Sequence, residues 1–175
     1  TAPYAAILTG ERTLVLKRTA DTSVTVATFA VTVAEGRDQS LYAIGGTGGS
    51  AITAFFTTDT NPAAPATQAR VRVVHLSPTA GSVDLFVTSP GADLAAATPT
   101  LAGVAYRGVS GYLTVNAGTY QLRAVPAGTA PASRAANVII NVASLALVGG
   151  TGRTIVAADN TTGGAPLRAF VLTDR

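Results

Sequence analysis

Apolar and polar side chains alternate along most of this chain, and no other feature constrains its fold as strongly. In the segment from Thr22 to Ala34, more than half of the residues are Val or Thr, which are β-branched. A period of two places successive side chains on opposite faces of a β-strand, and β-branched residues suit that pleated surface. Such segments recur along the chain with Gly- and Pro-containing turns between them, a pattern typical of an all-β sandwich or barrel.

The alternation predicts a series of short strands, and a single helical turn is expected, at Ala92–Ala97. The expected strands are Leu14–Lys17, Thr22–Ala34, Gln39–Ile44, Ile52–Thr57, Arg70–Leu76, Val83–Thr88, Val104–Tyr106, Gly111–Val115, Tyr120–Val125, Asn137–Val148, Thr154–Ala158 and Leu167–Leu172. For residues 66–175 we predict a complete antiparallel, immunoglobulin-like β-sandwich of about seven strands. Its core candidates are Val71, Val73, Leu85, Val87, Leu122, Val138, Ile140, Val142, Ile155 and Phe170.

The composition is that of a folded chain with few charges. Of 175 residues, 47% are hydrophobic and 12% are charged, with 12 Lys and Arg against 9 Asp and Glu. The cations are scattered and form no basic stripe with interleaved aromatic residues, which nucleic-acid-binding proteins usually display. No apolar run reaches the roughly 18 residues that a membrane span needs. We therefore expect neither a nucleic-acid partner nor a membrane span.

Cysteine, methionine and tryptophan are absent. Their absence excludes disulfides, thiolate catalysis and cysteine-ligated metals. Because there is no initiator Met, we expect a processed chain or a piece of a longer one, from which any signal peptide has been removed. The abundance of Thr, Ala, Gly and Val, with Arg replacing nearly all Lys, is typical of a secreted bacterial protein from a GC-rich genome.

The beginning of the chain repeats its end. The similar segments are Thr13–Lys17 and Thr119–Arg123, Ser40–Ala43 and Thr154–Ala157, and Ala54–Asp59 and Ala169–Asp174. Residues 1–60 therefore copy only the second half of residues 66–175. We predict an incomplete sandwich repeat over residues 1–60, a Pro/Ala-rich linker over residues 61–69, and a complete sandwich over residues 70–175.

An incomplete sandwich exposes apolar surface and unpaired backbone groups along its strand edges. A buried unpaired polar group costs about 1–3 kcal/mol, so we expect something to complete the sheet. Three arrangements do so: fusion of the two parts into one enlarged sandwich, an adjoining segment of a longer protein, or strands donated by a neighbouring subunit. We favour donation by a subunit, which propagates head-to-tail into a filament unless it closes into a ring.

Two stretches of the second half resemble a known family. Ala69–Pro78 followed by Val83–Val87 looks like the opening of the domain-of-unknown-function family 4397, and Tyr112–Tyr120 resembles that family's next signature, a strand, a Gly turn and a strand. The resemblance covers one full domain and the back half of another. It implies secreted or surface-exposed bacterial β-sandwich modules, often in tandem, and it implies no chemistry.

His75 is the only histidine, and it is the strongest candidate for catalysis. A nucleophilic site would use His75 as the base, Asp84 to orient it and Ser77 as the nucleophile. However, Ser77 precedes a proline and lacks the Gly-x-Ser-x-Gly turn that exposes a catalytic serine. We therefore expect these residues to brace the first two strands, through a His–Asp contact or separate hydrogen bonds in the turns, and we predict no catalytic residue.

The glycine-rich and acidic turns do not have the patterns of known ligand sites. Gly45–Gly49 and Gly149–Gly152 lack the Gly-Lys-Ser/Thr ending of a phosphate loop, and hairpin turns with positive φ explain them better. Asp59–Asn61 and Asp159–Thr162 offer oxygen ligands but lack the spacing of an EF-hand loop. We predict no metal and no cofactor, and the nine acids single out no pair for glycoside hydrolysis.

Tyr112 and Tyr120 flank one hairpin and are the candidates for a sugar-stacking platform, although such a pair is more often a cross-strand core contact. The sequence thus favours a non-enzymatic structural or adhesive protein, located outside the cell or at its surface. The alternative is a module of a secreted protein that binds polysaccharide.

Overall fold

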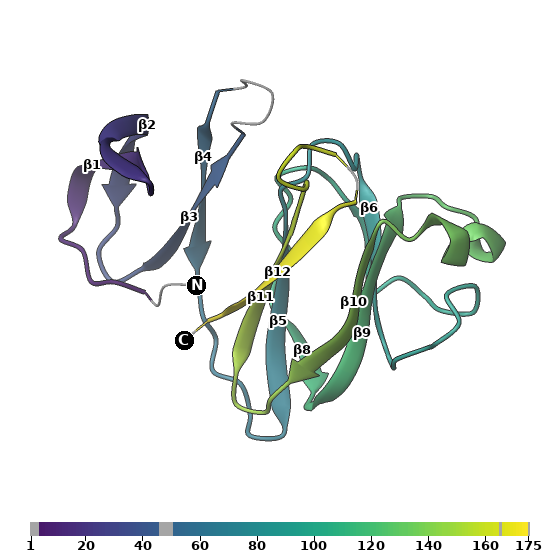
Figure 1. Ribbon diagram of the computed structural model, residues 1–175. Helices are drawn as coiled ribbons and strands as arrows, with labels where there is room; N and C mark the ends of the chain where they lie inside the picture. The colour runs from purple at the N-terminus through teal and green to yellow at the C-terminus, as the bar shows by residue number, and fades with distance from the viewer. Residues whose placement is uncertain (1–3, 46–50, 165, 175) are drawn as a thin grey trace. The chain divides into compact units, whose positions relative to one another are not determined.

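The computed structural model describes residues 4–45, 51–164 and 166–174. The chain forms two compact units, Ala2–Asn61 and Pro62–Arg175, which we call the N-terminal unit and the C-terminal unit. Strands dominate both units (Figure 1). The prediction of an all-β chain is confirmed.

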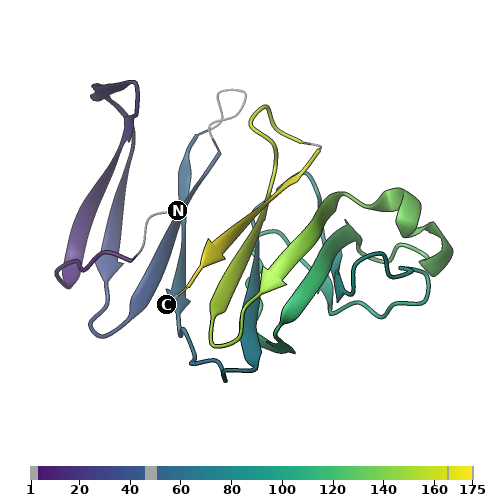
Figure 2. The same cartoon turned by 60° about the horizontal axis from the view of Figure 1, so that its bottom comes forward.

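The C-terminal unit is a sandwich of two four-stranded sheets (Figures 1 and 2). One sheet has the order β10-β9-β6-β7 and the other β12-β11-β5-β8. The strand bounds are β5 (Gln68–His75), β6 (Val83–Thr88), β7 (Leu101–Val104), β8 (Leu113–Asn116), β9 (Gly118–Pro126), β10 (Ile140–Leu147), β11 (Gly152–Ala158) and β12 (Arg168–Thr173).

Three details of this sandwich differ from the sequence prediction. It has these eight strands rather than about seven, and β5 and β11 run parallel, so it is not purely antiparallel. Ala92–Ala97 contains a turn but no helix. Among its described residues, the C-terminal unit instead has two short 3₁₀ helices, η2 (Pro131–Ser133) and η3 (Ala135–Asn137). Pro131 is the first residue of η2.

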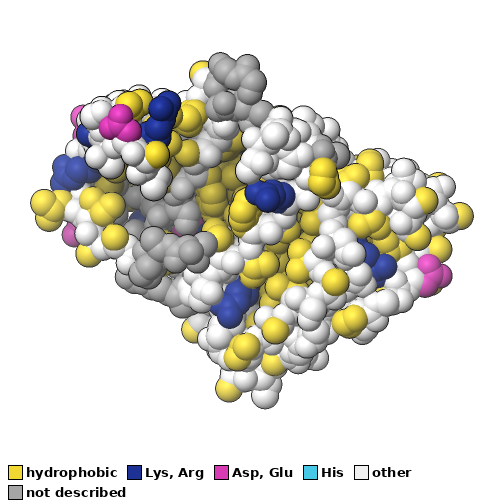
Figure 3. Space-filling view, viewed as in Figure 1, with side chains coloured by type: hydrophobic (Ala, Val, Ile, Leu, Met, Phe, Trp, Pro, Cys, Tyr) yellow, Lys and Arg dark blue, Asp and Glu magenta, His cyan; other side chains and the backbone are white. Residues whose placement is uncertain are grey.

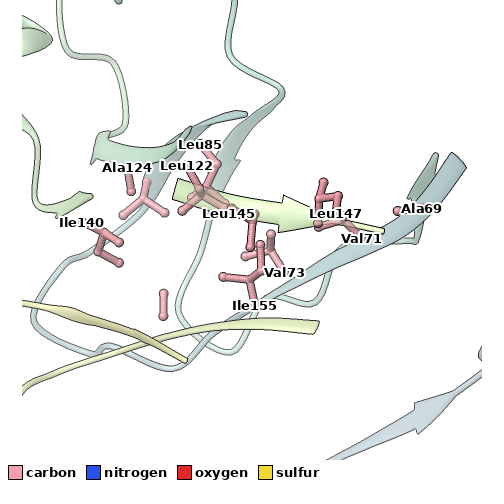
Figure 4. Close-up of a cluster of buried hydrophobic side chains, with 12 residues drawn as sticks. Ala69, Val71, Val73, Leu85, Leu122, Ala124, Ile140, Leu145, Leu147 and Ile155 are labelled. Carbon is pink, nitrogen blue, oxygen red and sulfur yellow. The ribbon is translucent and has the colours of Figure 1, made fainter. Parts of the chain in front are cut away.

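The main core lies between the two sheets, and Figure 4 shows how side chains from β5, β6, β9, β10 and β11 meet there. Of the predicted core residues, six are buried and Val87, Val138 and Val142 are partly buried. Phe170 was a wrong prediction, because it is 47% exposed. It pairs with Val156, whereas Ile155 and Ala157 are the β11 residues that belong to the main core, so the alternation places Phe170 on the outer face of edge strand β12.

A second, smaller core lies under the long connection from β6 to β7. Phe86, Leu94 and Val125 are buried there, although Phe86 and Val125 neighbour main-core residues along their own strands. The sheet that contains β6 and β9 is therefore covered on both faces over part of its length.

The N-terminal unit consists of two antiparallel hairpins. The first pairs β1 (Gly10–Arg18) with β2 (Asp21–Val33), and the second pairs β3 (Asp38–Ile44) with β4 (Thr53–Asp59). Each hairpin is a separate two-stranded sheet among the described strands. Val31 is the one hydrophobic side chain in the described part of this unit that is buried.

These hairpins match the last four strands of the C-terminal unit. Gly10 pairs with Val33 as Gly118 pairs with Leu147, and Gln39 pairs with Thr58 as Arg153 pairs with Thr173. Thus β1-β2 corresponds to β9-β10, and β3-β4 corresponds to β11-β12.

The structural match corrects one sequence alignment. Gly10 corresponds to Gly118, so Thr13 corresponds to Gln121 and not to Thr119. The local sequence resemblance aligned β1 with β9 two residues out of the structural register. A shift of two residues keeps every side chain on the same face of the strand, so the alternation alone does not reveal the error.

Candidate functional site

His75 is fully buried and takes part in the turn that follows β5. Its Nε2 lies 2.7 Å from the carbonyl oxygen of Gly81, and the Ser77 backbone N–H donates to its Nδ1 at 3.4 Å. These partners fit a neutral ring that carries its proton on Nε2. Both ring nitrogens are therefore engaged by the turn itself.

Asp84 does not orient His75. Its two carboxylate oxygens accept the backbone N–H groups of Gly103 at 2.8 Å and Gly128 at 3.2 Å. Of the two bracing arrangements considered from sequence, the structure has separate hydrogen bonds in the turns. The carboxylate joins β6 to the segments around Gly103 and Gly128.

Ser77 donates its hydroxyl proton to Asp159, and Thr79 donates to the same oxygen at 2.8 Å. Burial alone would raise the pKa of Asp159, but hydrogen bonds from Ser77, Thr79 and the Gly164 backbone outweigh it and lower that pKa. The serine is thus a hydrogen-bond donor to a carboxylate after β11. Ser77, His75 and Asp84 do not form a nucleophile–base–acid chain.

Tyr112 and Tyr120 have different surroundings. Tyr120 packs against the main core and donates its hydroxyl to the Asn116 carbonyl at 2.9 Å. Tyr112 donates to Asp174 at 3.0 Å, and the Arg72 guanidinium lies 5.1 Å from its ring centre. Burial raises the pKa of Tyr112; the charge of Arg72 opposes this shift, and the charge and hydrogen bond of Asp174 add to it.

The Tyr112 contact belongs to a polar cluster on the outer face of the β12-β11-β5-β8 sheet. Thr154 is fully buried, donates to the Asp174 carboxylate at 2.9 Å and accepts from Arg72 Nε at 2.9 Å. Arg72 on β5 thereby reaches the same carboxylate network as the tyrosine. We call Arg72, Tyr112, Thr154 and Asp174 the C-terminal polar cluster.

The glycine run at Gly149–Gly152 forms a tight turn against the start of the unit. Gly150 has φ of 78° and donates its N–H to Pro65 and Gln68 carbonyls. A Cβ on Gly149 would lie 1.9 Å from the Ala66 carbonyl oxygen, so only glycine fits there. Of the other run, Gly46–Gly49 lies outside the described residues.

The acidic turns are occupied by hydrogen-bond donors from the protein. Asn160 accepts from the Thr162 backbone and hydroxyl at 2.7 Å, an ordinary Asx turn. Within the described ranges, no three His, Cys, Asp or Glu side chains gather into a group that suits a metal ion. In the same ranges no helix is long and apolar enough to cross a membrane.

A second polar cluster lies in the N-terminal unit, and the sequence analysis missed it. Asp59 is 4% exposed and accepts hydroxyl protons from Tyr4 at 2.6 Å, from Thr57 at 2.8 Å and from Ser40. Burial, and then the hydrogen bond to Asp59, raises the pKa of Tyr4. We call Tyr4, Ser40, Thr57 and Asp59 the N-terminal polar cluster.

The two clusters occupy equivalent places. Tyr4 lies six residues before Gly10 as Tyr112 lies six before Gly118. Asp59 is the last residue of β4, and Asp174 comes directly after β12. Ser40 corresponds to Thr154 in the matched register of β3 and β11. Each cluster also has one member without an equivalent in the other: Arg72 from β5 in the C-terminal cluster, and Thr57 from β4 in the N-terminal cluster.

The N-terminal unit has no described strand that corresponds to β5, β6 or β7. In the C-terminal unit, β9 pairs with β6 and β11 pairs with β5, so the corresponding edges of β1 and β3 are open within this unit. Leu16 is 38% exposed where Ala124 is fully buried, and Leu41 is 38% exposed where Ile155 is 1% exposed. The side of the hairpins that should face a core is therefore only partly covered.

Residues 5–8 show the same deficit. They correspond to β8, which pairs with β5, but they form no strand. Ile7 and Leu8 are 53% and 80% exposed. The candidate functional site is therefore the incomplete side of the N-terminal unit. It consists of the open edges of β1 and β3, the exposed apolar residues along them, and residues 5–8, which correspond to a strand but form none.

Charge does not favour a nucleic-acid interface on the visible face. In Figure 3 the Lys and Arg side chains on the C-terminal unit are separated from one another, and hydrophobic side chains lie between them. This distribution agrees with the scattered cations of the sequence.

Comparison with known families agrees with the fold. The model of the family described as "Domain of unknown function (DUF4397)" matches residues 1–86 and 87–175, which together span the chain. The chain belongs to the DUF4397 family. The border between the two DUF4397 segments falls inside β6, so the segments do not coincide with the two structural units. No curated protein matches the sequence.

Proposed function

We propose that this DUF4397 protein is a non-enzymatic structural protein of the bacterial exterior, and that its N-terminal unit accepts strands from a neighbouring subunit. The observation that carries the proposal is the pair of open edges on β1 and β3, equivalent to edges that β6 and β5 fill in the C-terminal unit. Open edges with exposed apolar side chains are templates for strand addition.

Energetics support completion of this unit. Burying a Leu side chain fully contributes about 1.5–3 kcal/mol relative to leaving it exposed, and Leu16 and Leu41 are only partly buried. Because each is 38% exposed, a strand that covers them gains part of this energy, and it also pairs the backbone groups of the open edges. A donor surface that differs from the acceptor surface gives head-to-tail assembly into a filament or a ring.

In the proposed role, the residues considered as catalytic candidates only stabilise the fold. His75, Ser77 and Asp84 have hydrogen-bond partners within the turns, and these partners hold the C-terminal sandwich together. The chain thus combines one complete sandwich with one incomplete unit that can accept strands from a neighbour.

The experiment is to purify the chain without denaturant and examine it by light scattering and negative-stain microscopy. We expect oligomers or fibres that disappear when Leu16 or Leu41 is replaced by Lys. Val15→Lys is the matched control, because Val15 is 50% exposed, neighbours Leu16 and points to the opposite face of β1. A monodisperse, folded 17.4 kDa monomer would overturn the proposal.

A further inference from the structure

We infer that the N-terminal units of two copies of this chain complete each other around a twofold axis. In this arrangement β1 pairs with β1′ and β3 pairs with β3′, where the prime marks a strand of the partner subunit. The inference rests on the proposed function and names the strands that the neighbouring subunit contributes. Each copy contributes the same two edges that it leaves open, so no strand has to leave a finished sandwich.

The number of strands in the complete sandwich supports this pairing. The C-terminal unit has two four-stranded sheets, in which β10 and β12 are edge strands and β9 and β11 are interior strands. The described strands of the N-terminal unit are the equivalents of these four. Two such units give the sheets β2-β1-β1′-β2′ and β4-β3-β3′-β4′, which keep β2 and β4 at the edges and place β1 and β3 inside. Two half-sandwiches thus make one sandwich with eight strands, as in the C-terminal unit.

The complete sandwich also shows that both open edges belong to one side of the unit. The hairpins β9-β10 and β11-β12 lie across the main core from each other, because Leu122 and Ile155 both belong to that core and β10 contacts β12. Their inner edges, at β9 and β11, border the half of the sandwich in which β6 and β5 continue the two sheets. The equivalent edges are those of β1 and β3. One twofold axis perpendicular to both sheets therefore pairs each of these strands antiparallel with its own copy.

The symmetry restricts the register of both strands. Residues directly opposite each other point to the same face of a sheet, so the axis passes through a residue and not between two residues. β1 has nine residues, and an axis at its central residue, Leu14, pairs all of them. The central residue of β3 is Leu41. Leu14 and Leu41 correspond to Leu122 and Ile155, which both belong to the main core, so one axis through the core serves both strands.

This register pairs opposite charges across the new junction. With the axis at Leu14, Glu11 lies opposite Lys17 of the partner subunit, and the symmetry repeats the pair. Both side chains are exposed, and both lie on the face of β1 that points away from the core. Opposite charges in such cross-strand positions stabilise a sheet. Moving the axis by one residue toward the C-terminus instead places Arg12 opposite Arg18 of the partner subunit, so the charges favour the axis at Leu14.

The pairing also covers apolar side chains of the N-terminal unit. Leu16, Leu41 and Phe56 are exposed on faces that correspond to the core face of the C-terminal sandwich. In the dimer β1 and β3 become interior strands, and their core faces lie beside those of the partner. Because Val31 is the one buried hydrophobic side chain in the described part of this unit, the second copy supplies a core that one copy lacks.

Cysteine cross-linking measures the register directly, because the chain has no cysteine of its own. Thr13 and Val15 are exposed, and the axis at Leu14 places Thr13 opposite Val15 of the partner subunit. Directly opposite residues of an antiparallel pair are within reach of a disulfide. Two copies of the same residue are displaced by about 7 Å along the strands, in addition to the spacing between them, and are out of reach.

We therefore expect mild oxidation to link Thr13→Cys chains to isotope-labelled Val15→Cys chains when the two are mixed. Mass spectrometry should find one chain of each kind in every linked dimer. Neither variant alone should form a disulfide-linked dimer.

Charge reversal tests the same pairing in the chain without cysteines. Glu11→Lys and Lys17→Glu each place like charges opposite each other twice in the dimer. Each variant alone should dimerise about tenfold more weakly by analytical ultracentrifugation. An equimolar mixture should recover the affinity, because it restores both opposite-charge pairs. Glu35→Lys, in the exposed turn between β2 and β3, changes the net charge equally and is the matched control.

The outcomes separate this inference from the proposed function. Linked dimers that form only in the mixture, with recovery on mixing the charge variants, support both. Oligomers in which the single cysteine variants link as well as the mixture overturn the twofold register and leave donation by a subunit standing. Amide protection of residues 5–8 in such oligomers indicates a β5-type donor, since these residues gain no neighbouring strand in the twofold dimer. A folded monomer at the highest protein concentration overturns both.

Discussion

Gly149 is at the closest backbone approach of the C-terminal sandwich. A Cβ at this position would overlap the Ala66 carbonyl oxygen, so Gly149→Ala requires movement of one of two main-chain segments. We expect a loss of about 2 kcal/mol or more in the free energy of unfolding, measured with denaturant. Gly111→Ala is the control, because nothing lies within 4 Å of a Cβ there. It should change the stability by about 0.5 kcal/mol or less, and a similar effect at both positions would contradict the prediction.

Asp159 makes the stability of the C-terminal unit depend on acid. Its pKa is lowered in the folded state from the ordinary 3.8, chiefly because the hydrogen bonds from Ser77 and Thr79 outweigh its burial. The folded state therefore binds fewer protons here than the unfolded chain does, and the stabilisation is complete above pH 3.8 and lost as the pH falls through the lowered pKa.

Denaturant unfolding between about pH 6 and pH 2 measures this effect. Asp159→Asn should remove that part of the decline, and Ser77→Ala should reduce it. Asp93→Asn, in an exposed turn, should leave the decline unchanged. An unaltered pH profile in Asp159→Asn would show that other carboxylates cause it.

At the scale of single elements, the alternation of side chains located most strands. The bounds of β6 agree with the prediction, and β2 differs by one residue at each end. The strand expected at Val104–Tyr106 lies earlier, at Leu101–Val104, because Tyr106 and Arg107 form a turn in which Arg107 has φ of 62°. Alternation shows which residues can pair, but backbone turns decide where pairing ends.

The parallel pairing of β5 with β11 and the polar clusters were beyond the sequence argument. Both depend on which strands become neighbours: β5 and β11 meet across 82 residues at Arg72 and Thr154, and Tyr4 reaches Asp59 across 55 residues. Local patterns contain no such information. Tyr4 had one available signal, its spacing before Gly10, which repeats the spacing of Tyr112 before Gly118. Asp59 and Asp174 were aligned from sequence, but their role as hydrogen-bond acceptors became visible only with the strands in place.

Arg134 fixes the long connection between β6 and β7. It donates to the carbonyls of Leu94 at 3.1 Å and Ala97 at 2.8 Å, and its guanidinium lies 5.1 Å from the Phe86 ring centre. Arg134→Ala should lower the free energy of unfolding by about 1–3 kcal/mol, because two partly buried carbonyls lose a charged donor. Arg168→Ala, on exposed β12, is the control.

Hydrogen exchange separates a local effect of Arg134 from a global one. The substitution Arg134→Ala should accelerate amide exchange in residues 92–98 compared with the unmodified protein. It should accelerate exchange in β9 less. Uniform acceleration across the sandwich would contradict a specific role in this connection.

At the scale of the whole molecule, the two units differ in what stabilises them. The C-terminal unit encloses a core formed by both sheets, whereas Val31 is the one buried hydrophobic side chain in the described part of the N-terminal unit. The hairpins β1-β2 and β3-β4 retain their pairing, but an isolated two-stranded hairpin is marginally stable in water. The stability of the N-terminal unit should therefore depend on whatever covers its open edges.

This dependence predicts two unfolding transitions with different responses to protein concentration. A neighbour that binds the folded N-terminal unit stabilises it by mass action, by about 2.7 kcal/mol when the free neighbour is at a hundred times its dissociation constant. Hydrogen exchange followed through increasing urea should show β1–β4 opening first, at a urea concentration that rises with protein concentration. The urea midpoint for β5–β12 should stay constant.

Leu41→Lys, which weakens the covering contact, should remove the concentration dependence of the first transition and leave the second unchanged. A single transition for all strands, or a first transition that is independent of concentration in the unmodified chain, would contradict completion by a second subunit.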